Sequence, residues 1–143
     1  MVYDEIVVEL RIISATLSPP EINDYIGIKC DDSQVRGEMN RLGTKRYPRH
    51  AWYLASKRVV APHEYIGDKI DIEVRNLLSR LAPVAGKIRE LSQSHEVEFS
   101  LYFLARDVPP MNLSKEDLGA IAALGASLDI DLILYANPEA EKA

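Results

Sequence analysis

The longest regular pattern in the chain is an apolar stripe between residues 70 and 91. Its members recur at alternating spacings of four and three residues, which places them on one side of a helix. They are Ile70, Val74, Leu77, Leu81, Val84, Ile88 and Leu91, with Leu78 and Ala85 beside them. The spacing also fits a coiled coil, but three heptads interrupted by Pro83 favour a helix packed on a sheet. Pro83 either kinks this helix or begins a second one.

Alternation of apolar and polar residues predicts the strands. The strand segments lie near residues 4–14, 51–57, 96–106 and 129–136. The last segment contains the run 132–134, which is apolar on both sides and indicates a strand inside the sheet. A weaker run, Val35 to Glu38, is expected to pair with the strand around Trp52. The polar segment 39–50 between these two predicts a long hairpin loop.

Two shorter helices have clear start signals. Ser18, Pro19 and Glu21 form the pattern of a capping box with proline at the first helical position, and Gly27 is expected to end this helix. Ser114 opens a similar helix that ends near Gly125. The residues expected on its inward side are Leu118, Ile121, Ala122 and Leu124. The likeness between the two starts fits either an internal duplication or two ordinary caps.

Together these elements predict one α+β domain over residues 1–143. Its sheet is mixed and has about five strands, with helices packed mainly on one face. A duplication would divide it into two related strand–helix–strand halves, as in ferredoxin-like folds. The polar tail 137–143 is expected to fray.

Composition adds limits on location. Of the 143 residues, 47% are apolar and 27% charged, as in ordinary globular proteins, and no run is apolar enough to suggest a membrane span. Acidic residues stand at the N-terminus where a secretory signal needs basic ones, and the single cysteine, Cys30, cannot form an internal disulfide. Both features favour the cytoplasm. The net charge of −5 argues against nucleic acid as the default partner.

Positive charge is concentrated between residues 36 and 58. Seven Lys and Arg residues face only Glu38 there, so the segment carries +6 and the remainder of the chain −11. The candidate residues for binding an anion or a partner are Arg36, Arg41, Lys45, Arg46, Arg49 and Trp52. Arginines beside aromatic rings suit phosphate contact and base stacking. The alternative is a solvated hairpin whose cations balance acids elsewhere, with Trp52 in the core.

Other reactive residues form no recognisable catalytic or metal site. Cys30 precedes two aspartates, which disfavour a reactive thiolate and indicate a small buried thiol. The three histidines have no metal-ligand spacing, so we expect no metal and no cofactor. Asp129 and Asp131 share one strand face, where they hold a cation, act as an acid–base pair or simply face water. No catalytic residue is assigned.

The order of the motifs resembles the bacterial domain of unknown function 4279 family. The resemblance extends from about Tyr3 to Tyr135. It rests on the segments 25–28 (Tyr-Ile-Gly-Ile), 35–37 (Val-Arg-Gly), 52–56 (Trp-Tyr-Leu-Ala-Ser), 118–125 and 128–131 (Leu-Asp-Ile-Asp). It implies a small, single-domain bacterial protein that stands alone, and it brings no activity and no site residue.

Two functions remain open. The first is a non-enzymatic protein-interaction module, such as a toxin-neutralising or regulatory partner, supported by the charge segregation and the missing catalytic motif. The second is a binder of anionic small molecules or single-stranded nucleic acid through the basic hairpin 36–58. An enzyme with an unrecognised site is a third, less supported interpretation.

Overall fold

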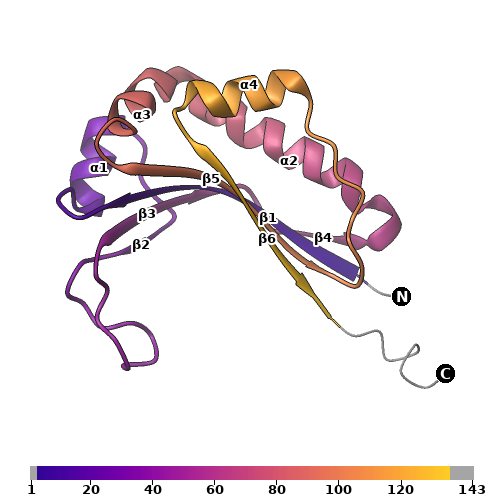
Figure 1. Cartoon of the computed structure of the whole chain (residues 1–143), viewed down its shortest axis with the longest axis horizontal. Coiled ribbons are helices and arrows are strands. Elements are labelled where there is room, and N and C mark those ends of the chain that lie inside the picture. Colours follow the sequence, from indigo (N-terminus) through magenta and orange to yellow (C-terminus); the bar gives the residue numbers. More distant parts are fainter. Residues whose placement is uncertain (1–2, 136–143) are drawn as a thin grey trace.

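A computed structural model describes residues 3–135, and it shows a single sheet with four helices on one face (Figure 1). In chain order the elements are β1 (Tyr3–Ser14), α1 (Pro19–Ile26), β2 (Asp32–Gln34), β3 (His50–Ala55), β4 (Val59–Pro62), the 3₁₀ turn η1 (His63–Tyr65), α2 (Ile66–Leu81), the 3₁₀ turn η2 (Ala82–Val84), α3 (Ala85–Leu91), β5 (Glu96–Ala105), α4 (Lys115–Ala123) and β6 (Ser127–Leu134). The predicted α+β class is confirmed. The predicted fraying of the tail 137–143 lies outside the described residues. Within 3–135, no helix combines the length and apolarity that crossing a membrane requires.

The sheet has six strands among the described residues, in the order β2-β3-β1-β5-β6, with β4 beside the first residues of β1. β5 and β6 are parallel, and every other pairing is antiparallel. The two strand–helix–strand units therefore differ, because β1 and β3 flank α1 as antiparallel strands whereas β5 and β6 flank α4 as parallel strands.

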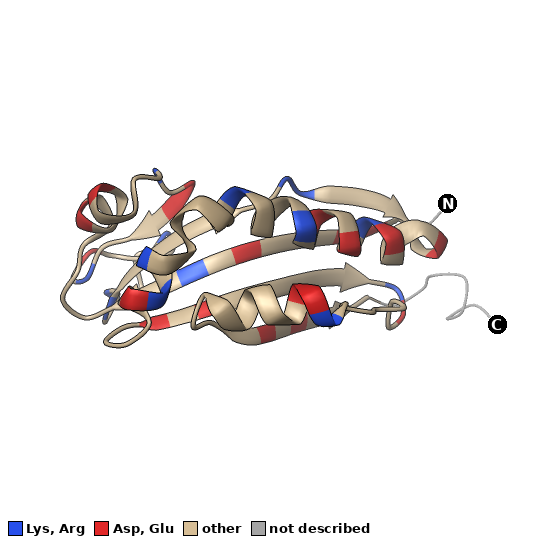
Figure 2. Cartoon of the chain, turned by 90° about the horizontal axis from the view of Figure 1, so that it is seen from above, with Lys and Arg blue, Asp and Glu red and all other residues tan. Residues whose placement is uncertain are grey.

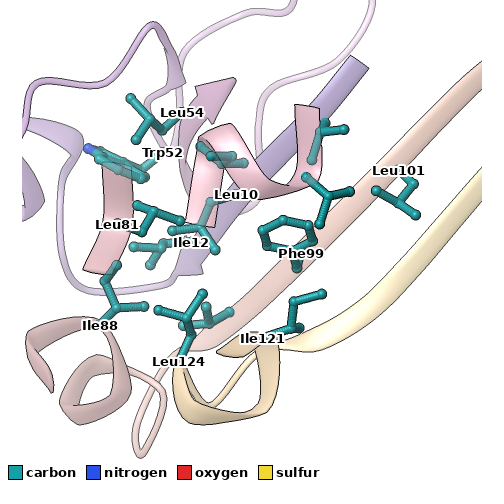
Figure 3. Close-up of a cluster of buried hydrophobic side chains, with 14 of the residues drawn as sticks. Leu10, Ile12, Trp52, Leu54, Leu81, Ile88, Phe99, Leu101, Ile121 and Leu124 are labelled. Atoms are coloured by element: carbon teal, nitrogen blue, oxygen red, sulfur yellow. The ribbon is translucent and has the colours of Figure 1, made fainter. Parts of the chain in front are cut away.

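The core lies between the sheet and the helix layer. β1 alternates as predicted, with one face buried and the other half-exposed along its length. Trp52, Leu10 and Phe99 of the sheet lie opposite Leu81, Ile88 and Ile121 of the helices (Figure 3). All six side chains are at most 3% exposed, so this cluster is the apolar partner that the helical stripe requires.

The predicted stripe is confirmed as the buried face of two helices. Val74, Leu77 and Leu81 of α2, with Ile88 and Leu91 of α3, are all buried. Pro83 separates the two helices within η2, since proline cannot donate the backbone hydrogen bond that a continuous helix needs. α2 begins four residues before the predicted stripe, at the buried Ile66.

The predicted helix caps are also confirmed, with one correction. The Ser18 side chain accepts the N–H of Glu21 in a full capping box, and Ser114 accepts the N–H of Asp117. In α4, however, Leu118 is 44% exposed and Ala122 is exposed. α4 packs through Asp117, Ile121 and Leu124, and at 100° per residue the positions 118 and 122 lie on its flank.

Two strand predictions are wrong in position. Val35 to Glu38 is a turn, because Gly37 has φ +87° and the N–H of Glu38 bonds to the carbonyl of Val35. The strand that pairs with Trp52 is β2, three residues earlier. The last strand, β6, lies at an edge of the sheet and not inside it. Its apolar residues are consequently exposed and not buried.

Candidate functional site

The segment between β2 and β3, residues 35–49, projects below the sheet on the side away from the helices (Figure 1). We call it the basic loop. It folds as a small hairpin of its own, in which Tyr47 donates to the carbonyl of Glu38 at 2.9 Å and Asn40 donates to that of Lys45 at 2.9 Å. A β-bridge joins Met39 and Arg46. The basic loop is therefore held in a defined shape by its own backbone.

The arginines of the basic loop reach different partners. Arg36 donates to the carbonyl of Ala15 at 3.1 Å, and Arg46 donates to the carbonyl of Gly37 at 2.7 Å. Arg49 pairs with Glu96 at 3.0 Å, across the end of the sheet. These three side chains diverge and do not converge on one pocket.

Arg41 and Lys45 occupy the outer part of the basic loop and are exposed. The Arg41 side chain is 89% exposed, and its guanidinium lies 3.7 Å from the Asp32 carboxylate. Beside it is a shallow depression of about 380 Å³ lined by Asp32, Asn40, Arg41, Leu42 and Tyr47, together with Ser33 and Gln34. Whether these residues bind an anion or a partner stays a prediction.

Trp52 requires a correction, because it lies in the core. The ring is fully buried, and its Nε1 donates to the Asn23 side chain at 2.7 Å. Asn23 also accepts the backbone N–H of Cys30 at 2.9 Å, so the half-buried Cys30 belongs to the same structural contact. Trp52 offers no ring face to a ligand.

Arg11 lies in the middle of the uncovered sheet face among four carboxylates. Its guanidinium is 2.7 Å from Glu9, 3.4 Å from Asp129, 3.5 Å from Asp131 and 3.8 Å from Glu98. Burial alone would lower the pKa of Arg11, but the carboxylates outweigh it and raise that pKa. For Glu98, in contrast, burial is the main cause of a raised pKa. The cation held by Asp129 and Asp131 is thus the protein's own Arg11, which the sequence did not indicate.

A second unpredicted contact joins Asp4 and His63. Asp4 is fully buried, and its carboxylate accepts the N–H of Arg106 at 3.2 Å and contacts His63 Nδ1 at 2.5 Å. Such a pair can serve as a general base when a nucleophile lies beside it. Within residues 3–135, the hydrogen bonds of the His63 side chain go to Asp4 alone. The pair therefore satisfies a buried carboxylate. Asp4 and His63 are 59 residues apart in the chain, so no local sequence pattern predicts this contact.

A comparison with protein families matches residues 4–135 to one described as Domain of unknown function (DUF4279). The match covers nearly the whole chain, as the resemblance predicted. No curated protein and no solved structure matches the chain.

Proposed function

We propose that this chain, which belongs to the family described as Domain of unknown function (DUF4279), is a non-enzymatic protein-interaction module of the bacterial cytoplasm. The basic loop binds another protein. The surface of that partner is acidic and contains an apolar spot. A regulatory or toxin-neutralising role suits such a module, because both require recognition without chemistry.

The composition of the exposed basic loop carries the proposal. Its five cations and one acid give residues 35–49 a charge of +4. Leu42, in the outermost turn, is 84% exposed, and Met39 is 49% exposed. Arginine and methionine are enriched where proteins meet, whereas a phosphate site brings its cations to one point. Diverging arginines around exposed apolar side chains fit a broad protein surface better.

The defined shape of the basic loop supports the same conclusion. A flexible loop loses conformational freedom when it binds, and this loss weakens affinity. Here the hydrogen bonds between Glu38 and Tyr47 and between Asn40 and Lys45 order the loop before binding. The helix layer gives a contrast, since Figure 2 shows Lys and Arg interspersed with Asp and Glu along α2. The loop is the better candidate for steering an acidic partner.

A ligand-binding function has one observation in its favour. The depression of about 380 Å³ places Arg41 beside Tyr47, a combination that suits an anionic small molecule or a single-stranded nucleic acid. The nearby Asp32 carboxylate opposes it, because Asp32 both neutralises Arg41 and repels a phosphate. We therefore rank this function second.

The test compares two matched charge reversals. Arg41→Glu/Lys45→Glu changes exposed cations of the basic loop, and Arg80→Glu/Arg89→Glu changes exposed cations of α2 and α3. Each protein is used to capture partners from its host, and the partner is then purified and titrated against all three proteins. Loss of binding with the loop reversal alone supports the proposal. Equal binding by all three contradicts it.

Titration of the purified chain with nucleotides and short single-stranded oligonucleotides tests the second function. Calorimetry is preferable to tryptophan fluorescence, because the Trp52 ring is fully buried and cannot contact a ligand. Salt-sensitive binding that Arg41→Glu/Lys45→Glu abolishes would replace the protein-interaction proposal with the ligand function.

A further inference from the structure

The outer edge of β6 has no pairing strand within residues 3–135. β6 pairs with β5 over eight consecutive residues without a bulge, and its other side faces away from the sheet. Monomeric proteins commonly protect such an edge with a short strand, a proline, a bulge or a lysine. β6 contains no proline and no lysine. Its two charged residues, Asp129 and Asp131, both lie next to Arg11, which neutralises part of their charge.

β6 also carries much of the exposed apolar surface. Among the fifteen exposed large hydrophobic residues of the described chain, five belong to this strand. They are Leu128, Ile130, Leu132, Ile133 and Leu134, with exposed fractions between 38% and 52%. Leu128, Ile130, Leu132 and Leu134 lie in register with buried residues of β5, on the helix side of the sheet. They extend the apolar helix-side surface of β5 to the free edge of the sheet, which favours a partner that continues the sheet.

Among its described residues, a second copy of this chain has three strands that could pair with β6, namely β2, β4 and its own β6. The opposite side of the sheet ends in β2, of three residues, and β4, of four residues ending at Pro62. Neither matches an eight-residue strand, and proline removes a donor from β4. Head-to-tail stacking of copies is therefore disfavoured. The β6 strand of a second copy has equal length and the same apolar row, so pairing closes at two subunits.

We propose that this chain forms a homodimer in which β6 pairs antiparallel with β6 of a second copy, around a two-fold axis at Leu132. The sheet then continues through both subunits, and both helix layers lie on the same side. Charge and overlap together select the register, because among the axes that avoid facing aspartates the one at Leu132 pairs the longest part of β6, residues 130–134 of each copy. Axes at Asp129, Ile130 or Asp131 place aspartates directly opposite aspartates, which is destabilising. The axis at Leu132 places Asp131 opposite Ile133, and Ile130 opposite Leu134.

Single cysteines test this register, in a background where Cys30 is replaced by alanine. Leu132→Cys places two cysteines directly opposite each other with Cα atoms about 4.5–5.5 Å apart, within the range that a disulfide spans. Ile130→Cys, on the same face, places its two thiols about 13 Å apart, four residues out of register. Mild oxidation should cross-link the first variant and leave the second uncross-linked. Equal cross-linking of both, or of neither, overturns the proposed axis.

The oligomeric state tests the dimer itself. Sedimentation equilibrium of the full chain should give twice its mass of 16.1 kDa. Ile130→Lys should raise the dissociation constant of the dimer by more than about tenfold, because the change occurs twice at a two-fold interface. Ile72→Lys on α2 is the matched control, since Ile72 is 47% exposed and Ile130 46%. A wild-type monomer at its highest soluble concentration, or equal weakening by both variants, overturns the proposal.

Discussion

At the scale of single residues, Arg11 organises the uncovered face of the sheet. Its single guanidinium lies within 3.8 Å of the carboxylates of Glu9, Glu98, Asp129 and Asp131. The five side chains together therefore carry an excess of negative charge. Carboxylates brought this close repel one another once their shared cation is removed. The Arg11 side chain therefore helps to hold β1, β5 and β6 together through its ion pairs, in addition to the backbone pairing of these strands.

Replacing Arg11 should consequently destabilise the fold. We expect Arg11→Gln to lower the free energy of unfolding by about 1.5–3 kcal/mol, the range for hydrogen bonds to charged groups. Urea denaturation at neutral pH measures it. Arg75→Gln is the control, because that exposed side chain forms one ion pair, with Asp71 on its own helix. Equal losses for the two variants would contradict a central role for Arg11.

Replacing Glu98 should have the opposite effect on stability to replacing Arg11. Its pKa is raised in the folded protein, so the native state binds this proton more tightly than the unfolded state does. The Glu98 contribution to stability therefore falls as pH rises from the usual glutamate pKa through the raised value. Glu98→Gln should be at least as stable as the wild type at pH 7, and this advantage should vanish near pH 4. Denaturation at both pH values checks it, with exposed Glu116→Gln as the control.

At the scale of elements, the sequence predicted what local periodicity encodes. The buried stripe of α2 and α3 and the two helix caps were visible because they are set by residues three to four positions apart. The position of β6 was not visible. An apolar run on both strand faces is typical of a strand inside the sheet, but here it belongs to an edge strand. Long-range pairing decides between them, and alternation does not report it.

Truncating residues of the stripe should lower the free energy of unfolding much more than removing the helix caps. Leu77→Ala and Leu81→Ala should each cost about 2–5 kcal/mol, because both side chains are at most 1% exposed and leave a cavity. Ser18→Ala and Ser114→Ala should cost only about 1 kcal/mol each as lost caps. Chemical denaturation of the four variants gives the ranking. Comparable losses for all four would mean that the stripe is not the core.

The end of α4 gives a sharper test of local packing. Gly125 has φ +71°, and a Cβ at this position would lie 2.0 Å from Ser92 Oγ. Gly125→Ala should therefore destabilise, and adding Ser92→Gly should recover the steric part of the loss but not the backbone strain. Gly119→Ala, within α4 and in open space, should instead stabilise by up to about 1 kcal/mol. Equal effects of the two glycine changes would contradict this account.

At the scale of the whole molecule, one layer of helices covers one face of the sheet (Figure 1). The sequence predicted this class because the elements could be recognised individually. Strand order, the Arg11 cluster and the Asp4–His63 contact depend on residues distant in the chain, and periodicity carries no signal for them. The charge of the basic loop was visible from sequence. Its geometry was not, because the directions of Arg36, Arg46 and Arg49 depend on partners distant in the chain or set by the fold of the loop, namely two backbone carbonyls and the Glu96 carboxylate.

The central claim is that the basic loop recognises an acidic protein, and the salt dependence of association tests it most directly. The association rate of the captured partner is measured across ionic strengths for the wild type and for Arg41→Glu/Lys45→Glu. The wild-type rate should fall steeply as salt screens charge, and the reversed loop should associate slowly with little salt dependence. Arg80→Glu/Arg89→Glu should follow the wild type. Parallel salt curves for all three proteins would contradict recognition by the basic loop.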